Sequence, residues 1–409
     1  MAEKRKDSKG RNLRTGESER KDGRYVFRYT KNGKTSNIYA ATLGELREKE
    51  EEIQRDIQDG IDSNSAKTVT LNMTIEKYMQ SRTDWKPASR ESYNNVFVSH
   101  VKDDIGIRKV STIKYSDIRD FYTKIVEEKE LGVTTLNHID SIIHPALDVA
   151  VRDGIIRNNP ANHVASEIKK KYSLKRGKKV AMSIPEQKAF VEFMPMASKY
   201  NHTLGIITFL LGTGCRIGEA LGLTWDDVDF EGNTVAIRRT LLYRSFDGQP
   251  KTFHISTPKT MAGERTIPML AGVKKVLLEE KQKQTESGYK PFEVDGYSGF
   301  VFINPLSEKP YTHSIVDHAL HTICDEYNLY EGRRAAEEKR EPFFIPRISA
   351  HILRHTFATR FCENETNIKV IQDIMGHSSI HTTMDIYVNA TREAKQASIE
   401  NLEGNIFIG

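Results

Sequence analysis

The segment of residues 351–387 constrains the fold more than any other, because helical spacings and a helix end follow one another in it. His351 and Arg354 are three residues apart, which places their side chains on one face of a helix. Gly376 has the position of a helix C-cap, so His377 should lie in the turn beyond that helix. The segment therefore predicts helices whose ends present an arginine and imidazoles.

Tyr387 lies near the end of a further predicted helix, residues 380–388. A tyrosine hydroxyl needs a base before it can act as a nucleophile, since its ordinary pKa is about 10. Histidine can supply the base, and arginine offers a fork of donors that matches phosphate oxygens. This combination indicates phosphoryl transfer to a tyrosine without a metal ion.

A second group of candidate residues lies upstream of this segment. The apolar run of residues 204–211 ends at two glycines, and Arg216 opens the next helix. Glu219 follows one helical turn later, where it can orient the arginine. Lys259 lies near the tip of a predicted β-hairpin that turns at Gly263. Any of these residues alone would more often have a structural role, and only their order along the chain makes the signal specific.

The histidines also allow a metal interpretation. The pairs His351/His355 and His377/His381 have the i, i+4 spacing of zinc ligands. The sequence lacks an HExxH motif, however, and Arg354 lies between the first pair, where it would repel a cation. A P-loop pattern, GxxxxGK[ST], is also missing from the sequence. We therefore expect no metal, no ATP and no other cofactor.

Composition bounds the class of protein. The 409 residues are enough for two or three domains. No apolar run is long enough to span a bilayer, so a cytoplasmic protein without a membrane partner is expected. The three cysteines are scattered without a CxxC pair, which favours buried, reduced thiols. The net charge is only +5, but basic residues gather in residues 1–34 and 169–179, which favours binding to a polyanion.

The N-terminal part predicts a small sheet and one helix. Basic and aromatic residues alternate along residues 24–29, a return strand covers residues 36–39, and residues 8–15 could add a third strand. A helix over residues 43–60 would place Leu46, Ile53 and Ile57 on its apolar side. A basic sheet of this kind can lie in the major groove of DNA, although an unrelated protein partner is an alternative. The expected DNA contacts here are Arg24, Tyr25, Phe27 and Arg28.

Residues 68 to about 162 predict four short amphipathic helices, with Thr74 and Ser89 as the first two N-caps. The basic linker that follows is expected to track phosphates without reading sequence. Its expected DNA contacts are Lys169, Lys170, Lys171, Lys175 and Arg176.

Ser183 and Glu186 form a capping box, which marks the start of the last large domain. Three strands at residues 233–238, 252–256 and 259–267 should form one small sheet. Further helices are predicted at residues 204–211, 270–285, 313–327 and 390–402. The charged residues 331–340 are an exposed loop or a helix extension. The apolar tail at residues 405–408 needs a partner surface, on a neighbouring subunit or on its own domain.

Six residues in chain order resemble the active-site set of the tyrosine recombinases, the phage lambda integrase family: Arg216, Lys259, His351, Arg354, His377 and Tyr387. Over most of its length the chain looks most like the integrases of conjugative transposons. The implied fold is multidomain α+β, with a small N-terminal sheet plus helix, a helical bundle, and a mainly α catalytic domain with a small antiparallel sheet. The implied segments are an arm-type DNA-binding domain (1–62), a core-binding domain (68–166), a basic linker (167–180), a catalytic domain (181–402) and a C-terminal tail (403–409).

The resemblance also implies a role for each residue. The two arginines would bind the non-bridging oxygens of a DNA phosphodiester, and Tyr387 would attack it to form a 3′-phosphotyrosyl bond. His351 would exchange the proton of the tyrosine, and Lys259 would protonate the leaving 5′-oxygen. His377 would add a hydrogen bond to the phosphate, and Glu219 would support the site without reacting.

The implied enzyme is a tyrosine-type site-specific recombinase that integrates and excises a mobile element. Its expected partners are double-stranded DNA at core and arm sites, three further copies in a tetramer, and an excision factor as a candidate. Alternatives are a chromosome-dimer resolving recombinase, a type IB topoisomerase and a catalytically silent DNA-binding regulator. Tyr311 and Tyr330 compete with Tyr387 as nucleophile, but neither follows a Gly-His pair.

Overall fold

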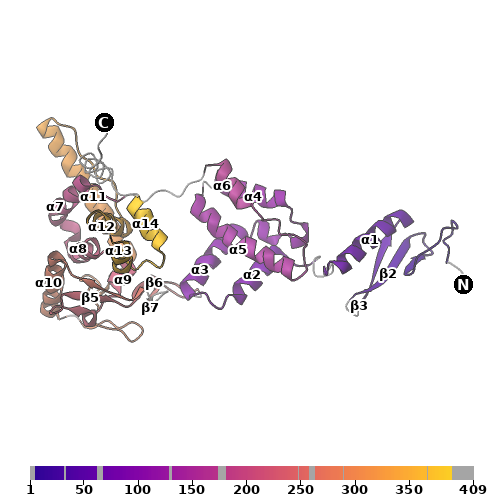
Figure 1. Ribbon diagram of the computed structural model, residues 1–409, viewed down its shortest axis with the longest axis horizontal. Coiled ribbons are helices and arrows are strands. Elements are labelled where there is room, and N and C mark those ends of the chain that lie inside the picture. Colours follow the sequence, from indigo (N-terminus) through magenta and orange to yellow (C-terminus); the bar gives the residue numbers. More distant parts are fainter. Residues whose placement is uncertain are drawn as a thin grey trace, which may run out of the picture. The chain divides into compact units, whose positions relative to one another are not determined.

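The structure is a computed structural model, and it describes residues 5–31, 34–61, 68–128, 131–173, 181–246, 248–257, 263–288, 290–365 and 367–388. The chain divides into two compact units, residues 1–177 and 178–409. Figure 1 shows helices as the main element of both units, with the strands confined to small sheets.

The first unit begins with a three-stranded antiparallel sheet in the order β1-β2-β3, which one helix covers (Figure 1). The elements are β1 (Glu17–Glu19), β2 (Tyr25–Lys31), β3 (Lys34–Ala40) and α1 (Leu43–Gln58). The sequence analysis placed a third strand at residues 8–15, but the structure has this strand at Glu17–Glu19. The carboxylate of Asp7 accepts hydrogen bonds from the backbone N–H groups of Lys9 and Arg11, which bends the chain there into a turn.

Helix α1 ends at the predicted stop, since Gly60 has a φ of +71°. Its buried side differs from the predicted one. Leu46 is buried, but Ile57 is 40% exposed and Glu50 takes a buried position instead.

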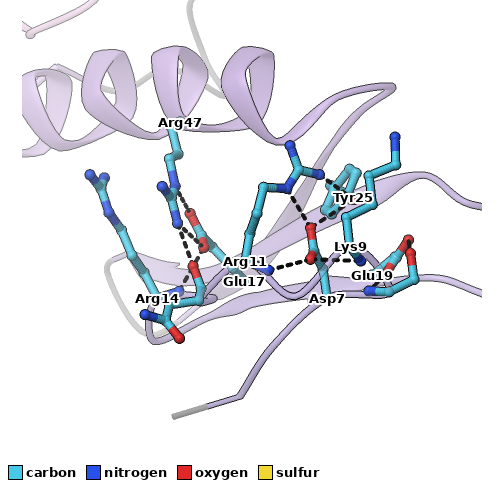
Figure 2. A network of polar contacts seen from close by, with 10 residues as sticks. Asp7, Lys9, Arg11, Arg14, Glu17, Glu19, Tyr25 and Arg47 are labelled. Atoms are coloured by element: carbon cyan, nitrogen blue, oxygen red, sulfur yellow. Dashed lines mark hydrogen bonds and ion pairs between the residues drawn. The ribbon is translucent and has the colours of Figure 1, made fainter.

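Polar contacts tie the N-terminal segment to the sheet and to α1 (Figure 2). The buried carboxylate of Glu17 accepts a hydrogen bond from Nε of Arg47 at 3.0 Å. Arg11 donates to Asp7 and to the hydroxyl of Tyr25, both at 2.7 Å. A small sheet on one helix buries few apolar side chains, so these charge-assisted hydrogen bonds add to the stability of the module.

A helical bundle forms the rest of the first unit. Its helices are α2 (Leu71–Ser81), α3 (Pro87–Val96), α4 (Tyr115–Glu127), α5 (Val133–Arg152) and α6 (Val164–Lys171), with short turns η2 (Phe97–Val101), η3 (Ile105–Ile107) and η4 (Val110–Thr112). The predicted apolar faces are buried, as Ile75, Phe121 and Ile139 illustrate. Helix α6 was not predicted, because its lysine-rich end resembles a linker.

Two helix starts in the bundle differ from the predicted ones. The N-cap of α2 is Thr70, whose hydroxyl accepts from the backbone N–H of Met73, and Thr74 is buried inside the helix. The N-cap of α3 is Lys86 with proline at the first helical position, so the predicted cap Ser89 lies inside the helix.

The second unit begins at the predicted capping box. Ser183 and Glu186 exchange hydrogen bonds at 2.7 and 3.3 Å. The first elements are α7 (Ile184–Phe193), η5 (Met194–Met196), η6 (Ser198–Thr203), α8 (Leu204–Thr213), α9 (Ile217–Leu221) and η7 (Trp225–Asp227). Helix α8 is apolar on all sides and lies in the centre of the core, as the sequence predicted.

The strands of the second unit form several small antiparallel sheets, so the prediction of one sheet is wrong. β4 (Val228–Asp229), β5 (Thr234–Ile237) and β8 (Arg265–Pro268) form one sheet, β6 (Thr240–Arg244) and β7 (Thr252–Ser256) another, and β9 (Ile303–Asn304) and β10 (Lys309–Pro310) a third. The error arises because period-2 patterns locate strands but do not reveal which strands pair.

The remaining helices carry most of the candidate site. They are α10 (Ala271–Ser287), α11 (His313–Glu338), α12 (Ala350–Asn364), α13 (Ile368–Met375) and α14 (Ile380–Val388). The charged insert at residues 331–340 is an extension of α11, one of the two predicted alternatives. The predicted helix at residues 390–402 and the apolar tail lie outside the described residues. In the part of the chain that the structure describes, no helix is long and apolar enough to cross a membrane.

Candidate active site

The site is built where helix ends meet in the second unit. Helix α8 ends at Gly214, whose φ is +63°, and α9 begins after Arg216. A Cβ on Gly214 would lie 2.3 Å from the ring of Phe357 on α12, so only glycine allows this close approach. The tight turn carries the guanidinium of Arg216 toward the end of α13, where its Nη2 donates to the carbonyl of Gly376 at 3.2 Å.

Arg354 on α12 reaches the same place from another side. It is 5% exposed, and its Nη1 donates to the carbonyl of Gly214 at 2.6 Å. Its Nη2 donates to the carbonyl of Met375 at 2.6 Å. Arg216 and Arg354 therefore bind adjacent carbonyls, Met375 and Gly376, and lie close together. Burial and then the charge of Arg216 lower the pKa of Arg354 to about 10, which still leaves it protonated near neutral pH.

Glu219 lies between two arginines of the candidate site. Its Oε1 accepts from Arg216 at 2.7 Å and its Oε2 accepts from Arg265 at 2.8 Å. Burial acts to raise the pKa of Glu219, but the hydrogen bond and charge of Arg265, with Arg216 adding, outweigh it and lower the pKa to about 2. The carboxylate is therefore ionised and offsets part of the positive charge.

Arg265 is a site residue to which sequence reasoning assigned no role. It begins β8, its side chain is only 6% exposed, and its Nε donates to the carbonyl of Ile374 at 2.7 Å. It closes a buried bridge from β8 through Glu219 to Arg216. Glu219 could have pointed to Arg265 in the sequence, because a buried carboxylate needs a partner for each of its oxygens and the side chain of Arg216 binds only one of them.

His377 lies in the turn after α13, as predicted, because Gly376 is a left-handed C-cap with a φ of +62°. The imidazole is 5% exposed, and its Nδ1 lies 3.0 Å from the hydroxyl of Thr383 on α14. Burial, followed by the charges of Arg354 and Arg216, lowers the pKa of His377 to about 4. The ring is therefore neutral near neutral pH and can still donate a hydrogen bond.

His351 lies one turn before Arg354 on α12 and is exposed. Its Nε2 lies 3.1 Å from Nε2 of His355, and the two rings are nearly perpendicular. That contact needs one N–H and one lone pair, so one of the two imidazoles is neutral in this geometry. A neutral imidazole at an exposed position can accept a proton, which is the role the sequence analysis assigned to His351.

Tyr387 lies in α14, which has the predicted bounds, but its side chain is not among the described ones. Lys259 lies outside the described residues. The competing tyrosine Tyr311 is 1% exposed and donates its hydroxyl to the carbonyl of His202 at 2.6 Å, so it is not available as a nucleophile. Tyr330 packs against Phe193. Among the described residues, no cluster of three or more His, Cys, Asp or Glu is arranged to hold a metal ion.

The N-terminal sheet presents a different set of residues from the predicted one. Tyr25 and Phe27 are 3% and 6% exposed and belong to the core under α1, so their side chains are not on the open face. Arg28 is exposed and lies opposite Asn37 in the neighbouring strand. Arg24 is also exposed and pairs with Asp22 at 2.7 Å.

The open face of the sheet also carries an aromatic residue that sequence reasoning did not select. Tyr39 is 44% exposed, and the guanidinium of Arg20 lies 5.3 Å from the centre of its ring. The alternation of inward and outward side chains along β2 and β3 is the signal that separates this face from the core.

The basic run expected in the linker begins inside a helix. Lys169, Lys170 and Lys171 form the last turn of α6, where positive charge is favoured by the helix dipole. Lys169 donates to the side chain of Asn137 at 2.9 Å. Lys175 and Arg176 lie outside the described residues.

Three known families match parts of the chain. The phage integrase family matches residues 182–394, the DNA binding domain of Tn916 integrase matches residues 1–57, and the phage integrase N-terminal SAM-like domain matches residues 70–126. The chain belongs to the phage integrase family, and its class is that of the tyrosine-type site-specific recombinases.

Within that family the chain is similar to transposon proteins. The transposase from transposon Tn1545 of Streptococcus pneumoniae is 32% identical over 98% of this chain and 97% of that protein. The transposase from transposon Tn916 of Enterococcus faecalis is 31% identical over the same shares. A solved structure of the Tn1549 transposon integrase in complex with transposon right end DNA has a TM-score of 0.70 at 28% identity, and covers 82% of this chain and 100% of that one.

Proposed function

We propose that this chain integrates and excises a mobile element of the conjugative-transposon type by cutting and rejoining DNA at specific sites. The observation that carries the proposal is the pair of anchored guanidinium groups. Arg216 and Arg354 donate to the carbonyls of Gly376 and Met375, so two positive charges are fixed side by side next to the neutral ring of His377. Such an arrangement of charges suits a phosphodiester whose negative charge grows in the transition state.

The proposed reaction has two matched steps. The oxygen of Tyr387 attacks phosphorus while the bond to the 5′-oxygen breaks, which leaves a 3′-phosphotyrosyl bond and a free 5′-hydroxyl. The proton of the tyrosine passes to His351, and the leaving oxygen takes a proton from Lys259. In the second step, the 5′-hydroxyl of another strand returns a proton to Lys259 and attacks phosphorus, while the bond to Tyr387 breaks and the tyrosine oxygen takes back the proton from His351. Because the covalent bond keeps the free energy of the phosphodiester, no nucleotide cofactor is needed.

The N-terminal sheet is proposed to bind arm sites through its open face. Arg20, Arg28, Asn37 and Tyr39 offer the charged, amide and aromatic groups that contact phosphates and base edges. The lysines at the end of α6 would contact the DNA backbone without reading sequence. Double-stranded DNA, a homotetramer assembled on it and an excision factor are the proposed partners, with core and arm sites bound by different domains.

The test is covalent trapping on a nicked duplex whose sequence is taken from the DNA that flanks the gene. The wild-type chain is compared with Tyr387→Phe, in EDTA and without ATP, on a denaturing gel. A protein–DNA adduct with wild type alone is expected. Tyr330→Phe is the matched control, since it removes the hydroxyl of a 44% exposed tyrosine outside the site and should leave the adduct unchanged.

Two results would contradict the proposal. An adduct that persists with Tyr387→Phe would show that another residue is the nucleophile. If the wild type binds the duplex yet forms no adduct, the chain is better described as a DNA-binding regulator.

A further inference from the structure

The segment that leads into α12 lies along α11 and is held there by a series of polar contacts. These contacts pair Phe343 with Glu331, Ile345 with Asn328, Arg347 with Asp325 and Ala350 with Asp317. The residue numbers fall along α11 as they rise along the segment, so the two run antiparallel. The contact between Ala350 and Asp317 is the last of the series, and it falls on the first turn of α12.

Asp317 takes the place of a helix cap. The N-cap residue of α12, Ser349, makes no capping hydrogen bond with its own side chain. The backbone N–H of Ala350 instead donates to Oδ1 of Asp317 at 2.8 Å. A carboxylate in this position satisfies one of the unpaired N–H groups of a helix start and interacts favourably with the helix dipole.

The second oxygen of this carboxylate is also held. Oδ2 of Asp317 lies 3.0 Å from Nε2 of His313, one turn earlier on α11. His313 is itself fixed at the start of its helix, because the hydroxyl of the N-cap Thr312 accepts from the backbone N–H of Ile315. The two contacts fix the rotation of the carboxylate, so that Oδ1 points at α12.

We propose that His313 and Asp317 are positioning residues for recombination, which hold the first turn of α12 so that His351 and Arg354 keep their places in the site. Ala350, whose N–H Asp317 binds, directly precedes His351 in the chain, and Arg354 follows one turn later. The carbonyls of Gly214 and Met375 hold the guanidinium group of Arg354. His313 and Asp317 act on the other end of this arrangement, the backbone of the first turn of α12. The inference rests on the proposed roles of His351 and Arg354.

Charged groups outside the pair act on it in opposite senses. Arg244 at the end of β6 acts to lower the pKa of His313 and so opposes its protonation, whereas His321, on the next turn of α11, acts to lower the pKa of Asp317 and so favours the carboxylate. The hydrogen bond to Asp317 is the main cause that raises the pKa of His313, and burial acts against it. Burial acts to raise the pKa of Asp317, but His313 and the N–H of Ala350 outweigh it and lower the pKa. Opposite shifts in the two partners are those of an ion pair.

The test compares the wild-type chain with four full-length variants in single-turnover cleavage of the nicked duplex at saturating protein, together with their affinity for the same duplex. Asp317→Ala removes both hydrogen bonds, whereas Asp317→Asn keeps an oxygen that can accept from Ala350. His313→Phe removes only the support of the carboxylate. The matched control is Glu337→Gln, which removes one negative charge from the same helix at an exposed position outside this series of contacts.

The expected result is a cleavage rate that falls about 10- to 100-fold for Asp317→Ala, since small misplacements of catalytic groups have effects of this size. DNA affinity should stay within about twofold, Asp317→Asn should recover most of the rate, and Glu337→Gln should equal wild type. If Asp317→Ala does not fold, His313→Phe carries the same comparison with an expected loss of about threefold or more.

Several outcomes would overturn the inference. They are an unchanged rate for Asp317→Ala and His313→Phe, an equal loss in Glu337→Gln, and a loss of DNA affinity that accounts for the whole effect. Failure of the proposed function is recognised separately, because the wild type itself would then form no adduct.

Discussion

The substitution Glu219→Gln tests the buried bridge under the site, because it removes the charge and nearly conserves the shape. Glu219 is 7% exposed at its side chain and binds Arg216 and Arg265, of which the second is 6% exposed. Its pKa falls from the ordinary 4.5 to about 2 in the fold. By linkage, this difference corresponds to about 3 kcal/mol of folding free energy at pH 7.

The pH dependence follows from the direction of the pKa change. The fold favours the carboxylate form of Glu219, so its contribution is fully present above pH 4.5 and is lost as the pH falls through 2. At pH 3, roughly 1.4 kcal/mol should remain. The difference between wild type and Glu219→Gln should therefore shrink by more than half between pH 7 and pH 3.

The assay is denaturant unfolding of the full chain followed by tryptophan fluorescence. The sequence has two tryptophans, Trp85 in the first unit and Trp225 in the second, so a Trp85→Phe background makes the signal specific for the second unit. Glu279→Gln is the matched control, because Glu279 is half exposed and its pair with Lys275 is 3.9 Å long. It should change the free energy of unfolding by less than about 0.5 kcal/mol.

The reasoning about Glu219 would be refuted by two results. One is a free energy of unfolding for Glu219→Gln that equals wild type at pH 7. The other is a destabilisation of the same size at pH 7 and pH 3, since that would point to packing and not to charge.

Three further predictions concern other parts of the chain. His377 should stay neutral from pH 8 to pH 5, because its pKa is lowered to about 4, and NMR of its ring nitrogens would contradict this by a titration near pH 6.5. Arg47→Ala should destabilise the N-terminal module by about 1.5–3 kcal/mol, because the charged hydrogen bond to Glu17 is lost. The measurement is hydrogen exchange, which should become faster in β2, and substitution of the exposed Glu48 by alanine is the control. The native chain should resist thiol alkylation at neutral pH, because burial raises the pKa to about 11 for each of three thiols: Cys215, Cys324 and Cys362. Rapid modification before unfolding would contradict this.

Elements with a strong local signal were predictable from the sequence. The capping box at Ser183, the apolar helix over residues 204–211 and the C-cap at Gly376 are all present in the structure. Each depends on contacts between residues close in the chain, so the sequence contains the full physical reason for it. The same holds for His377, whose place follows directly from the left-handed turn at Gly376.

Features that depend on distant contacts were not predictable. Helix α2 begins after Thr70 and not at Thr74, because Leu71 is buried and its N–H donates to the carbonyl of Arg108. Tyr25 reads as a surface residue in a basic strand, yet its hydroxyl is taken up by Asp7 and Arg11. In each case the partner lies well over ten residues away, where no periodic pattern extends.

The anchoring of the two arginines by main-chain carbonyls has a consequence for comparisons among related sequences. Gly214, Met375 and Gly376 hold the guanidinium groups with oxygens that every amino acid possesses. Pairwise co-variation should therefore reveal little about how Arg354 is held, since a change of residue at position 375 leaves its carbonyl in place. The exceptions are the two glycines, where a Cβ would lie 2.3 Å from Phe357 or 2.8 Å from Nη1 of Arg265. Sequence change at these positions should be limited more by the shape of the backbone than by which side chains stand beside the two arginines.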